Sequence, residues 1–309
     1  MKKKGKESPL FRERKGEKYT TNKGYKIEII EYFSSYNCTI KFEDGFIKEK
    51  VDYAQIRRGG VEKPYNRVGE KYITKQGYEV EIIEYFGSLN CNVQFNDINK
   101  TTLLNQQFAN VCKDTLINPY HPSVYGVGYI GKGKHKSGID GKRTVEYDVW
   151  RGMFKRCYDK KTQEKSPTYI GCLINEHWHN FQVFAEWFKE NYIEGWQLDK
   201  DILIKGNKIY SPETCAFVPQ QINKLFIKSE KTRGEYPLGV HCTGKSFEAR
   251  VNINGKGKHL GTFKTVEEAF QAYKNAKEAY IKEMADKWKD KIRPETYQAL
   301  INYQVEITD

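Results

Sequence analysis

Two carboxylates separated by one residue, Asp199 and Asp201, could jointly hold a divalent metal ion. They flank Lys200, and Asn207 follows them closely in the chain. Carboxylates suit Mg²⁺ and Mn²⁺, and Mg²⁺ usually keeps several waters, so two carboxylates can jointly hold it. Such an ion could stabilise charge on a phosphate or activate a water. Lys200 could serve as the base only if burial lowered its pKa by several units, because histidine normally fills that role.

A second group of potential ligands, Cys172, His177 and His179, lies upstream. The spacing of these residues matches neither the CxxC nor the HxxxH pairs of stable zinc sites, so zinc is not expected. We expect His177 and His179 to cap or line the helix that follows them. Either histidine could also approach the Asp199 site from outside.

The local pattern around Asp199 predicts the elements that position it. Residues 198–226 fit two strands joined at Gly206-Asn207, then a helix with Ser211 as N-cap and Pro212 at its first position. Upstream, apolar residues at helical spacing predict helices over 145–157 and 180–191, whose aromatic stripes should lie in the core. Residues 145–232 are therefore expected to form a helical and ββα domain.

This ββα unit resembles the HNH nuclease core of phage-encoded homing endonucleases over residues 198–223. In that family an Asp-His pair ends the first strand, and the Asp binds a divalent metal ion while the His activates water. The resemblance implies catalytic roles for Asp199, Lys200 and Asn207, with a further ligand position near Glu213 or Thr214. Because Lys200 replaces the family's His, it stays open whether the chain is an active endonuclease or a DNA-binding protein with an impaired site.

The C-terminal part predicts a three-stranded meander followed by one amphipathic helix. The runs 238–242, 246–252 and 258–263 fit strands, because turn residues separate them and apolar residues alternate along the middle run. Thr265 and Glu268 form a capping-box pattern, and an apolar stripe then extends to Met284. The helix should cover one face of the sheet. The other face should carry Arg250, Asn252 and either Lys258 or His259.

This block resembles the DNA-binding domain of plant ethylene-response factors, the APETALA type, which also occurs in phage nucleases and integrases. The matching residues are Gly239-Val240, Phe247-x-Ala249-x-Val251, Leu260-Gly261-Thr262-Phe263 and Glu268-Ala269 through Ala272-Tyr273. The resemblance implies double-stranded DNA as the partner, since a small sheet can enter the major groove. The residues expected at the groove are Arg250, Asn252, Lys258, His259 and Lys245. The alternative is an ordinary sheet-and-helix module with a solvated polar face.

A basic, glycine-rich segment covers residues 125–144. It combines six glycines with the cations Lys132, Lys134, Lys136, Lys142 and Arg143. We expect a mobile loop whose amides and cations contact the phosphate backbone, above all through Lys132, Lys134, Lys136 and Arg143. The alternative is a solvated linker.

The first third of the chain contains an internal repeat with an offset of 53 residues. The 29 residues that begin at Gly16 match those that begin at Gly69 at 18 positions. Alternating apolar residues predict two small β domains, 16–66 and 67–124, each a tightly curved antiparallel barrel or meander. The pair could bind nucleic acid, act as a spacer, or bind a host protein, which would make the chain an inhibitor of a host nucleic-acid enzyme.

Composition bounds these interpretations. The 309 residues include 52 Lys and Arg against 40 Asp and Glu, and a net charge of +12 favours a polyanionic partner. The basic segment 1–15 should be disordered and lacks the apolar run of a signal peptide, so a cytosolic protein that avoids membranes is expected. The seven cysteines form no CxxC pair and should be reduced, mostly buried thiols.

We therefore predict a modular α+β protein of phage or mobile-element type. After the two β domains, the basic loop and the central domain come the APETALA-type domain, 233–292, and a C-terminal helix and tail, 293–309, in which the helix starts at Pro294.

Overall fold

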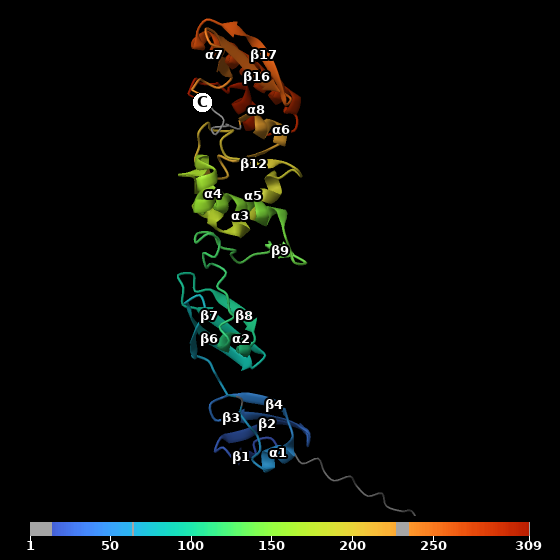
Figure 1. Cartoon of the computed structure of the whole chain (residues 1–309). Helices are drawn as coiled ribbons and strands as arrows, with labels where there is room; N and C mark the ends of the chain where they lie inside the picture. The colour runs from blue at the N-terminus through green and yellow to red at the C-terminus, as the bar shows by residue number, and fades with distance from the viewer. Residues whose placement is uncertain (1–13, 64, 227–234, 309) are drawn as a thin grey trace, which may run out of the picture. The chain divides into compact units, whose positions relative to one another are not determined.

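The computed structural model describes residues 14–63, 65–226 and 235–308 (Figure 1). Contacts divide the chain at Leu116 into two compact units, and each is described by itself below. Helices occur together with several small, mostly antiparallel sheets, which confirms the modular α+β class. Residues 1–13 of the predicted N-terminal segment, and the predicted boundary after 232, lie outside the described residues.

The first unit contains the two sequence repeats, each folded as a four-stranded antiparallel meander with one short helix. The first repeat consists of β1 (Lys18–Thr20), β2 (Lys26–Ser34), β3 (Asn37–Phe42), β4 (Ile47–Val51) and α1 (Tyr53–Arg57). The second consists of β5 (Lys71–Ile73), β6 (Glu79–Gly87), β7 (Asn90–Phe95), β8 (Thr102–Gln106) and α2 (Phe108–Cys112). The predicted meander is therefore confirmed in both copies.

The repeat extends further toward the N-terminus than the sequence match that begins at its glycine. Arg14 lies over the Tyr53 ring at 4.1 Å, and Arg67, 53 residues later, lies over the Phe108 ring at 4.2 Å. Register shifts also recur at matching places in β2 and β6. Each copy therefore has an arginine whose guanidinium packs on the aromatic residue that begins its helix.

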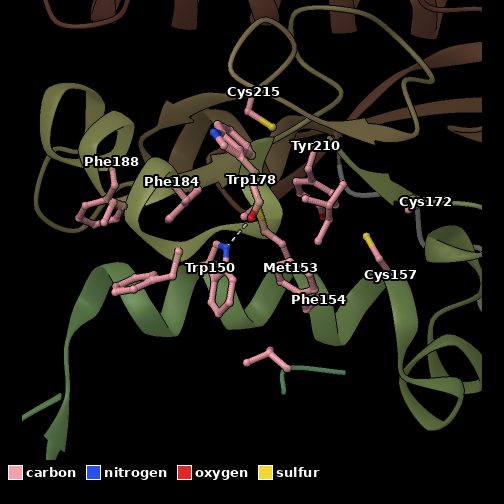
Figure 2. Packing of buried hydrophobic residues seen from close by; sticks show 14 of the residues in the cluster. Trp150, Met153, Phe154, Cys157, Cys172, Trp178, Phe184, Phe188, Tyr210 and Cys215 are labelled. Atoms are coloured by element: carbon pink, nitrogen blue, oxygen red, sulfur yellow. Dashed lines mark hydrogen bonds between the residues drawn. The ribbon is translucent and has the colours of Figure 1, made fainter. Parts of the chain in front are cut away.

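The second unit contains two helices that pack through aromatic side chains. After the glycine-rich segment come α3 (Val145–Tyr158), α4 (Lys160–Lys165), η1 (Pro167–Tyr169), β11 (Leu173–Ile174), η2 (Glu176–His179) and α5 (Phe181–Asn191). The stripes of α3 and α5 lie in one core, where the buried Trp150 indole donates from Nε1 to the carbonyl of Trp178 at 2.7 Å (Figure 2). Both predicted helices are confirmed, with Asn180 as the N-cap of α5.

The strand pairing predicted around Gly206-Asn207 is wrong. β12 (Gln197–Asp199) pairs antiparallel with β14 (Ala216–Val218), whereas β13 (Ile209–Tyr210) pairs parallel with β11. The helix predicted to start at Ser211 is also wrong, because residues 211–215 form a turn in which the Cys215 N–H donates to the Ser211 carbonyl at 3.0 Å. The helix α6 (Gln220–Asn223) begins after Pro219, followed by η3 (Lys224–Phe226). A ββα order persists, with β14 as its second strand.

The C-terminal meander and helix match the prediction. The sheet has the order β15 (Val240–Cys242), β16 (Phe247–Ile253) and β17 (Lys256–Phe263), and α7 (Val266–Trp288) lies across one face (Figure 1). The buried residues Ala249, Val251, Ala269 and Phe270 show that the sheet packs on the first half of this helix. The helix α8 (Pro294–Ile301) starts at Pro294 as predicted.

The second half of α7 packs on the central ββα unit. Tyr280, Ile281 and Met284 share a buried cluster with Ala216 and Val218 of β14, and α8 adds Leu300. The long helix therefore contributes to two cores, one with the sheet and one with the ββα unit.

Thr265 begins α7 through a complete capping box. The Glu268 N–H donates to the Thr265 side chain at 3.2 Å, and the Glu268 carboxylate accepts from the Thr265 N–H at 3.3 Å. Replacement of Thr265 by Ala should cost about 1 kcal/mol of the free energy of unfolding, because an exposed helix donor loses its partner. Thermal unfolding should show a lower Tm for this variant, whereas replacement by Ser should leave Tm nearly unchanged. An unaltered Tm for Thr265→Ala would show that the cap contributes nothing.

The glycine-rich segment is more structured than predicted. It contains a short hairpin, β9 (Gly138–Ile139) with β10 (Lys142–Arg143). Before the hairpin, Gln182 of α5 accepts from the His135 N–H at 2.9 Å and donates to the carbonyls of Ile130 at 3.2 Å and His135 at 2.9 Å. These bonds tie the loop to α5, which corrects the expectation of a mobile loop.

The seven cysteines are free, and all except Cys112 and Cys242 are buried, as predicted. Among the described residues, none of the helices combines the length and the apolar character that a bilayer crossing requires.

Candidate nucleic-acid interface and metal site

The register of the C-terminal sheet decides which side chains share its open face. Arg250 lies opposite His259, and cross-strand partners project to the same side of a sheet. Lys258 lies opposite the buried Val251, so it belongs to the side that α7 covers, although its side chain is exposed at the edge. His259, of the two predicted alternatives, therefore accompanies Arg250 and Asn252 on the open face.

Glu248 organises the charge on this face. Its carboxylate accepts from Arg250 Nε at 3.1 Å and Nη2 at 2.7 Å, and it lies 3.9 Å from His259 Nδ1. The arginine fork is thus held in one orientation over the strand while it remains 57% exposed. Asn252 is exposed beside it, and Lys245 is exposed in the turn between β15 and β16.

The cations of the glycine-rich segment lie on the surface of the second unit, and some are paired with carboxylates. Lys134 and His135 both contact Glu186, at 2.6 Å and 3.0 Å, and these hydrogen bonds lower the pKa of Glu186 to about 2. Arg143 lies 3.5 Å from Asp148. Lys132 and Lys136 are exposed. The surface therefore presents several cations to a phosphate backbone. Glu186 and Asp148 neutralise part of this positive charge.

The ββα unit borders a cleft that brings together side chains far apart in the sequence. The cleft has a volume of about 450 Å³ and continues into a second hollow of about 400 Å³. Both hollows are lined by Tyr169, Asp199, Lys200, Asp201 and Asn223. The first is also lined by Asp148, Gly152 and Arg156 of α3, and the second by Asn207.

Asp199 has one carboxylate oxygen engaged and one available. Oδ1 accepts from the N–H groups of Asp201 and Ile202, each at 2.7 Å, whereas Oδ2 accepts from no residue that the structure describes. Burial raises the pKa of the Asp199 carboxyl, although the two N–H bonds oppose that shift. A cation at Oδ2 would favour the ionised form again.

This raised pKa predicts that Asp199→Asn stabilises the metal-free protein. The folded state retains a proton on Asp199 that the unfolded chain releases at a lower pH, so this partly buried group weakens stability as pH rises. The variant should therefore show a higher Tm than the wild type at pH 7 in EDTA. The gain should shrink as pH falls below the ordinary range of an aspartate. A variant that melts lower than the wild type at pH 7 would contradict this assignment.

Lys200 and Asn207 hold the connection between β12 and β13. The buried Lys200 ammonium donates to the Asp201 carboxylate and to the Asn207 carbonyl, the latter at 2.6 Å. Asn207 Nδ2 donates in turn to the carbonyls of Lys200 at 2.8 Å and Ile209 at 2.7 Å. Both bonds hold the Lys200 side chain within the loop, so these contacts do not equip Lys200 as a base.

The other positions considered from the sequence lie away from the cleft. His179 Nε2 contacts the Ile174 carbonyl at 3.1 Å, and His177 is exposed at the entry to α5, so neither lines either hollow. Thr214 donates from Oγ1 to the Ile209 carbonyl at 2.7 Å within the turn, and Glu213 belongs to the same turn.

Sequence reasoning missed two residues of the cleft, Asn223 and Arg156. Asn223 Nδ2 donates to the Gln197 side chain at 2.7 Å, which leaves its Oδ1 as a potential ligand. Arg156 comes from α3, far earlier in the chain. No local signal marks either residue, because only the pairing of β12 with β14 and the packing of α3 bring them to Asp199.

The cleft offers oxygen donors of the kind that magnesium and manganese ions prefer. Asp199 Oδ2 and Asn223 Oδ1 are hard oxygen ligands, while one Asp201 oxygen is already bound by Lys200. Over residues 14–63, 65–226 and 235–308, no three His, Cys, Asp or Glu side chains gather as a metal cluster. Any ion would depend on one or two carboxylates and on water.

Comparison with known proteins gives no match to a protein-family model, to a curated protein or to a solved structure.

Proposed function

We propose that this chain binds double-stranded DNA and uses the open face of the C-terminal sheet to read the duplex. The observation that carries the proposal is the alignment of Arg250, Asn252 and His259 on one exposed face, opposite the face covered by α7. Guanidinium and amide groups form paired hydrogen bonds with base edges, and a sheet of this size fits the major groove.

The charge distribution supports the same proposal. Residues 117–309 contain 31 Lys and Arg against 24 Asp and Glu, whereas residues 16–116 contain 14 of each. Of the net charge of +12, +7 thus belongs to residues 117–309, which hold the sheet, the cleft and the glycine-rich segment, and the remaining +5 belongs to residues 1–15. Lys132, Lys134, Lys136 and Arg143 would contact phosphates, and Lys245 would approach the backbone beside the groove.

A mobility-shift selection from random duplexes tests this function. The proposal expects a recurrent short sequence to be enriched and its affinity to fall steeply as salt rises. Failure to retain any duplex at low salt would overturn it.

A metal-dependent nicking or cleaving endonuclease is a second candidate, favoured by Asp199 Oδ2 and Asn223 Oδ1 in one cleft. These two oxygens would hold Mg²⁺ or Mn²⁺, which when bound stabilises negative charge on a phosphate and activates water. Lys200 and Asn207 would hold in place the loop that presents Asp199. Asp201 would neutralise the charge of Lys200.

A protein-binding role of the tandem repeat is favoured by apolar residues exposed at equivalent hairpin positions. Phe33 and Tyr36 are 59% and 79% exposed, and Phe86 and Leu89, each 53 residues later, are 66% and 77% exposed. Both pairs lie at the β2–β3 or β6–β7 hairpin of a repeat with balanced charge. Exposed apolar residues at the same place in both copies suit a protein surface better than a polyanion.

The double substitution Phe33→Ser and Phe86→Ser separates this role from DNA binding. We expect duplex affinity to stay within about twofold of the wild type, because neither residue belongs to the basic unit, whereas a host partner should be lost. The measurement is a pull-down from nuclease-treated host extract with the wild type and with the double variant. The wild type should recover one identified protein that the double variant does not recover. A matching change at Tyr65, exposed outside the hairpins, is the control. Loss of duplex affinity in the double variant would instead assign the hairpins to DNA.

A further inference from the structure

One cation in the cleft, Arg156, is partly buried and has no carboxylate partner among the described residues. Among the described residues, no Asp or Glu lies within 4.0 Å of its guanidinium, although Asp148, Asp199 and Asp201 line the same cleft. Its partners are aromatic: Nε donates to the Tyr210 hydroxyl at 2.9 Å, and its charge lies 5.4 Å and 5.8 Å from the rings of Tyr210 and Tyr169.

The charge of Arg156 lacks the carboxylate partner that an arginine drawn into a protein normally has. Desolvation opposes this charge, but Tyr210 and Tyr169 favour it, so the pKa of Arg156 is raised and the side chain stays cationic. The cleft therefore holds a cation that can pair with a bound anion.

The geometry leaves the fork of the guanidinium for that anion. Nε is occupied by Tyr210, whereas neither Nη atom has a hydrogen-bond partner among the described residues, and neither is sealed from solvent. The hydrogen bond from Nε to Tyr210 anchors one side of the group at the cleft, which leaves its two Nη atoms as donors. A fixed guanidinium fork matches the paired oxygens of a phosphate.

We infer that Arg156 is the receptor for one backbone phosphate of the bound duplex, and that this phosphate lies in the cleft beside Asp199. The inference rests on the proposed DNA-binding function and extends it from the sheet to the cleft. Lys200 does not compete for the phosphate, because Asp201 and the Asn207 carbonyl already engage its ammonium.

The test uses the full chain and a duplex obtained by selection, synthesised with a single neutral methylphosphonate at each linkage in turn. The wild type should lose about tenfold in affinity at one linkage, since a hydrogen bond to a charged group is then removed. Arg156→Met should bind the unmodified duplex about tenfold more weakly and should no longer respond to the substitution at that linkage. Because no carboxylate among the described residues pairs with Arg156, the Tm of the variant without DNA should stay close to that of the wild type.

Two further variants keep the test decisive. Tyr210→Phe retains the ring and removes the hydroxyl, so it should weaken binding less than Arg156→Met at the same linkage. Arg156→Lys retains the charge without the fork and should give an intermediate loss, which also serves if Arg156→Met fails to fold.

The possible outcomes separate the role of Arg156 from the proposed DNA binding by the chain. If Arg156→Met keeps wild-type affinity and the wild-type methylphosphonate profile while Arg250→Ala weakens binding, the inference is overturned and the function stands. If the wild type binds no duplex, both fall. A lower Tm of Arg156→Met with an unchanged methylphosphonate profile would show that Arg156 is structural.

Discussion

Arg250→Ala should weaken binding to the selected duplex by about 1–3 kcal/mol, or roughly 5- to 150-fold, and should leave binding to random duplexes much less affected. Arg250 is exposed at the centre of the open face, where its fork is held by Glu248 and lies opposite His259. A base-reading contact is lost only on the correct sequence, whereas a phosphate contact is lost on every sequence. Fluorescence anisotropy with both duplexes gives the two losses directly.

Two controls separate base reading from charge. Lys134→Ala should weaken binding to all duplexes alike and should reduce the slope of log K against log salt by about 1. Glu248→Gln removes the carboxylate that holds Arg250, so it should strengthen binding to random duplexes while it reduces discrimination. Equal losses for Arg250→Ala on selected and random duplexes would remove the proposed role of the sheet in reading sequence.

If the chain nicks plasmid in the presence of Mg²⁺ or Mn²⁺, Asp199→Ala should reduce the rate by about 100-fold or more. A bound divalent ion supplies several kcal/mol of transition-state stabilisation, and Asp199 provides an available carboxylate oxygen in the cleft. Asn223→Ala should also reduce the rate, since its Oδ1 is the second candidate ligand.

Glu213→Gln is the matched control for that experiment. Glu213 lies near the ligand position that the HNH resemblance suggests, yet it belongs to the turn after β13 and does not line the cleft. Its substitution should leave nicking unchanged. Nicking that survives Asp199→Ala would exclude this site, and nicking lost with Glu213→Gln would place the metal elsewhere.

Much of the fold could be predicted from the sequence where local signals agree. In β16 the alternation of buried Ala249 and Val251 with exposed Arg250 and Asn252 fixes both faces, and the capping box fixes the start of α7. The repeat predicted two equal domains because identical apolar positions must fill equal cores.

The prediction failed where pairing depends on distant segments. The run Ala216–Val218 is buried at every position, and so short an apolar run fits a helix and a buried strand equally well. Ser211 and Pro212 suit a helix start, but Thr214 uses its hydroxyl to close a turn onto Ile209 instead. The parallel pairing of β13 with β11 spans more than 30 residues and has no local signal.

The site was predictable only in part for the same reason. The sequence shows Asp199 and Asp201 as two carboxylates one residue apart. Asn223 and Arg156, in contrast, come from helices that are distant from Asp199 in the sequence. Whether Lys258 or His259 lies on the open face depends on the bulge next to Arg250, which the sequence does not reveal. A shift of one residue in the register moves a side chain to the other face of the sheet.

The most direct measurement is photo-crosslinking of the full chain to the selected duplex from a benzoylphenylalanine placed at Thr262, which is exposed opposite Glu248 on the open face. The same group at Asn275, exposed on α7, is the reference. We expect efficient crosslinks to bases from Thr262, reduced at high salt, and few from Asn275. Crosslinks from Asn275 with none from Thr262 would show that the duplex lies on another surface and would contradict the account.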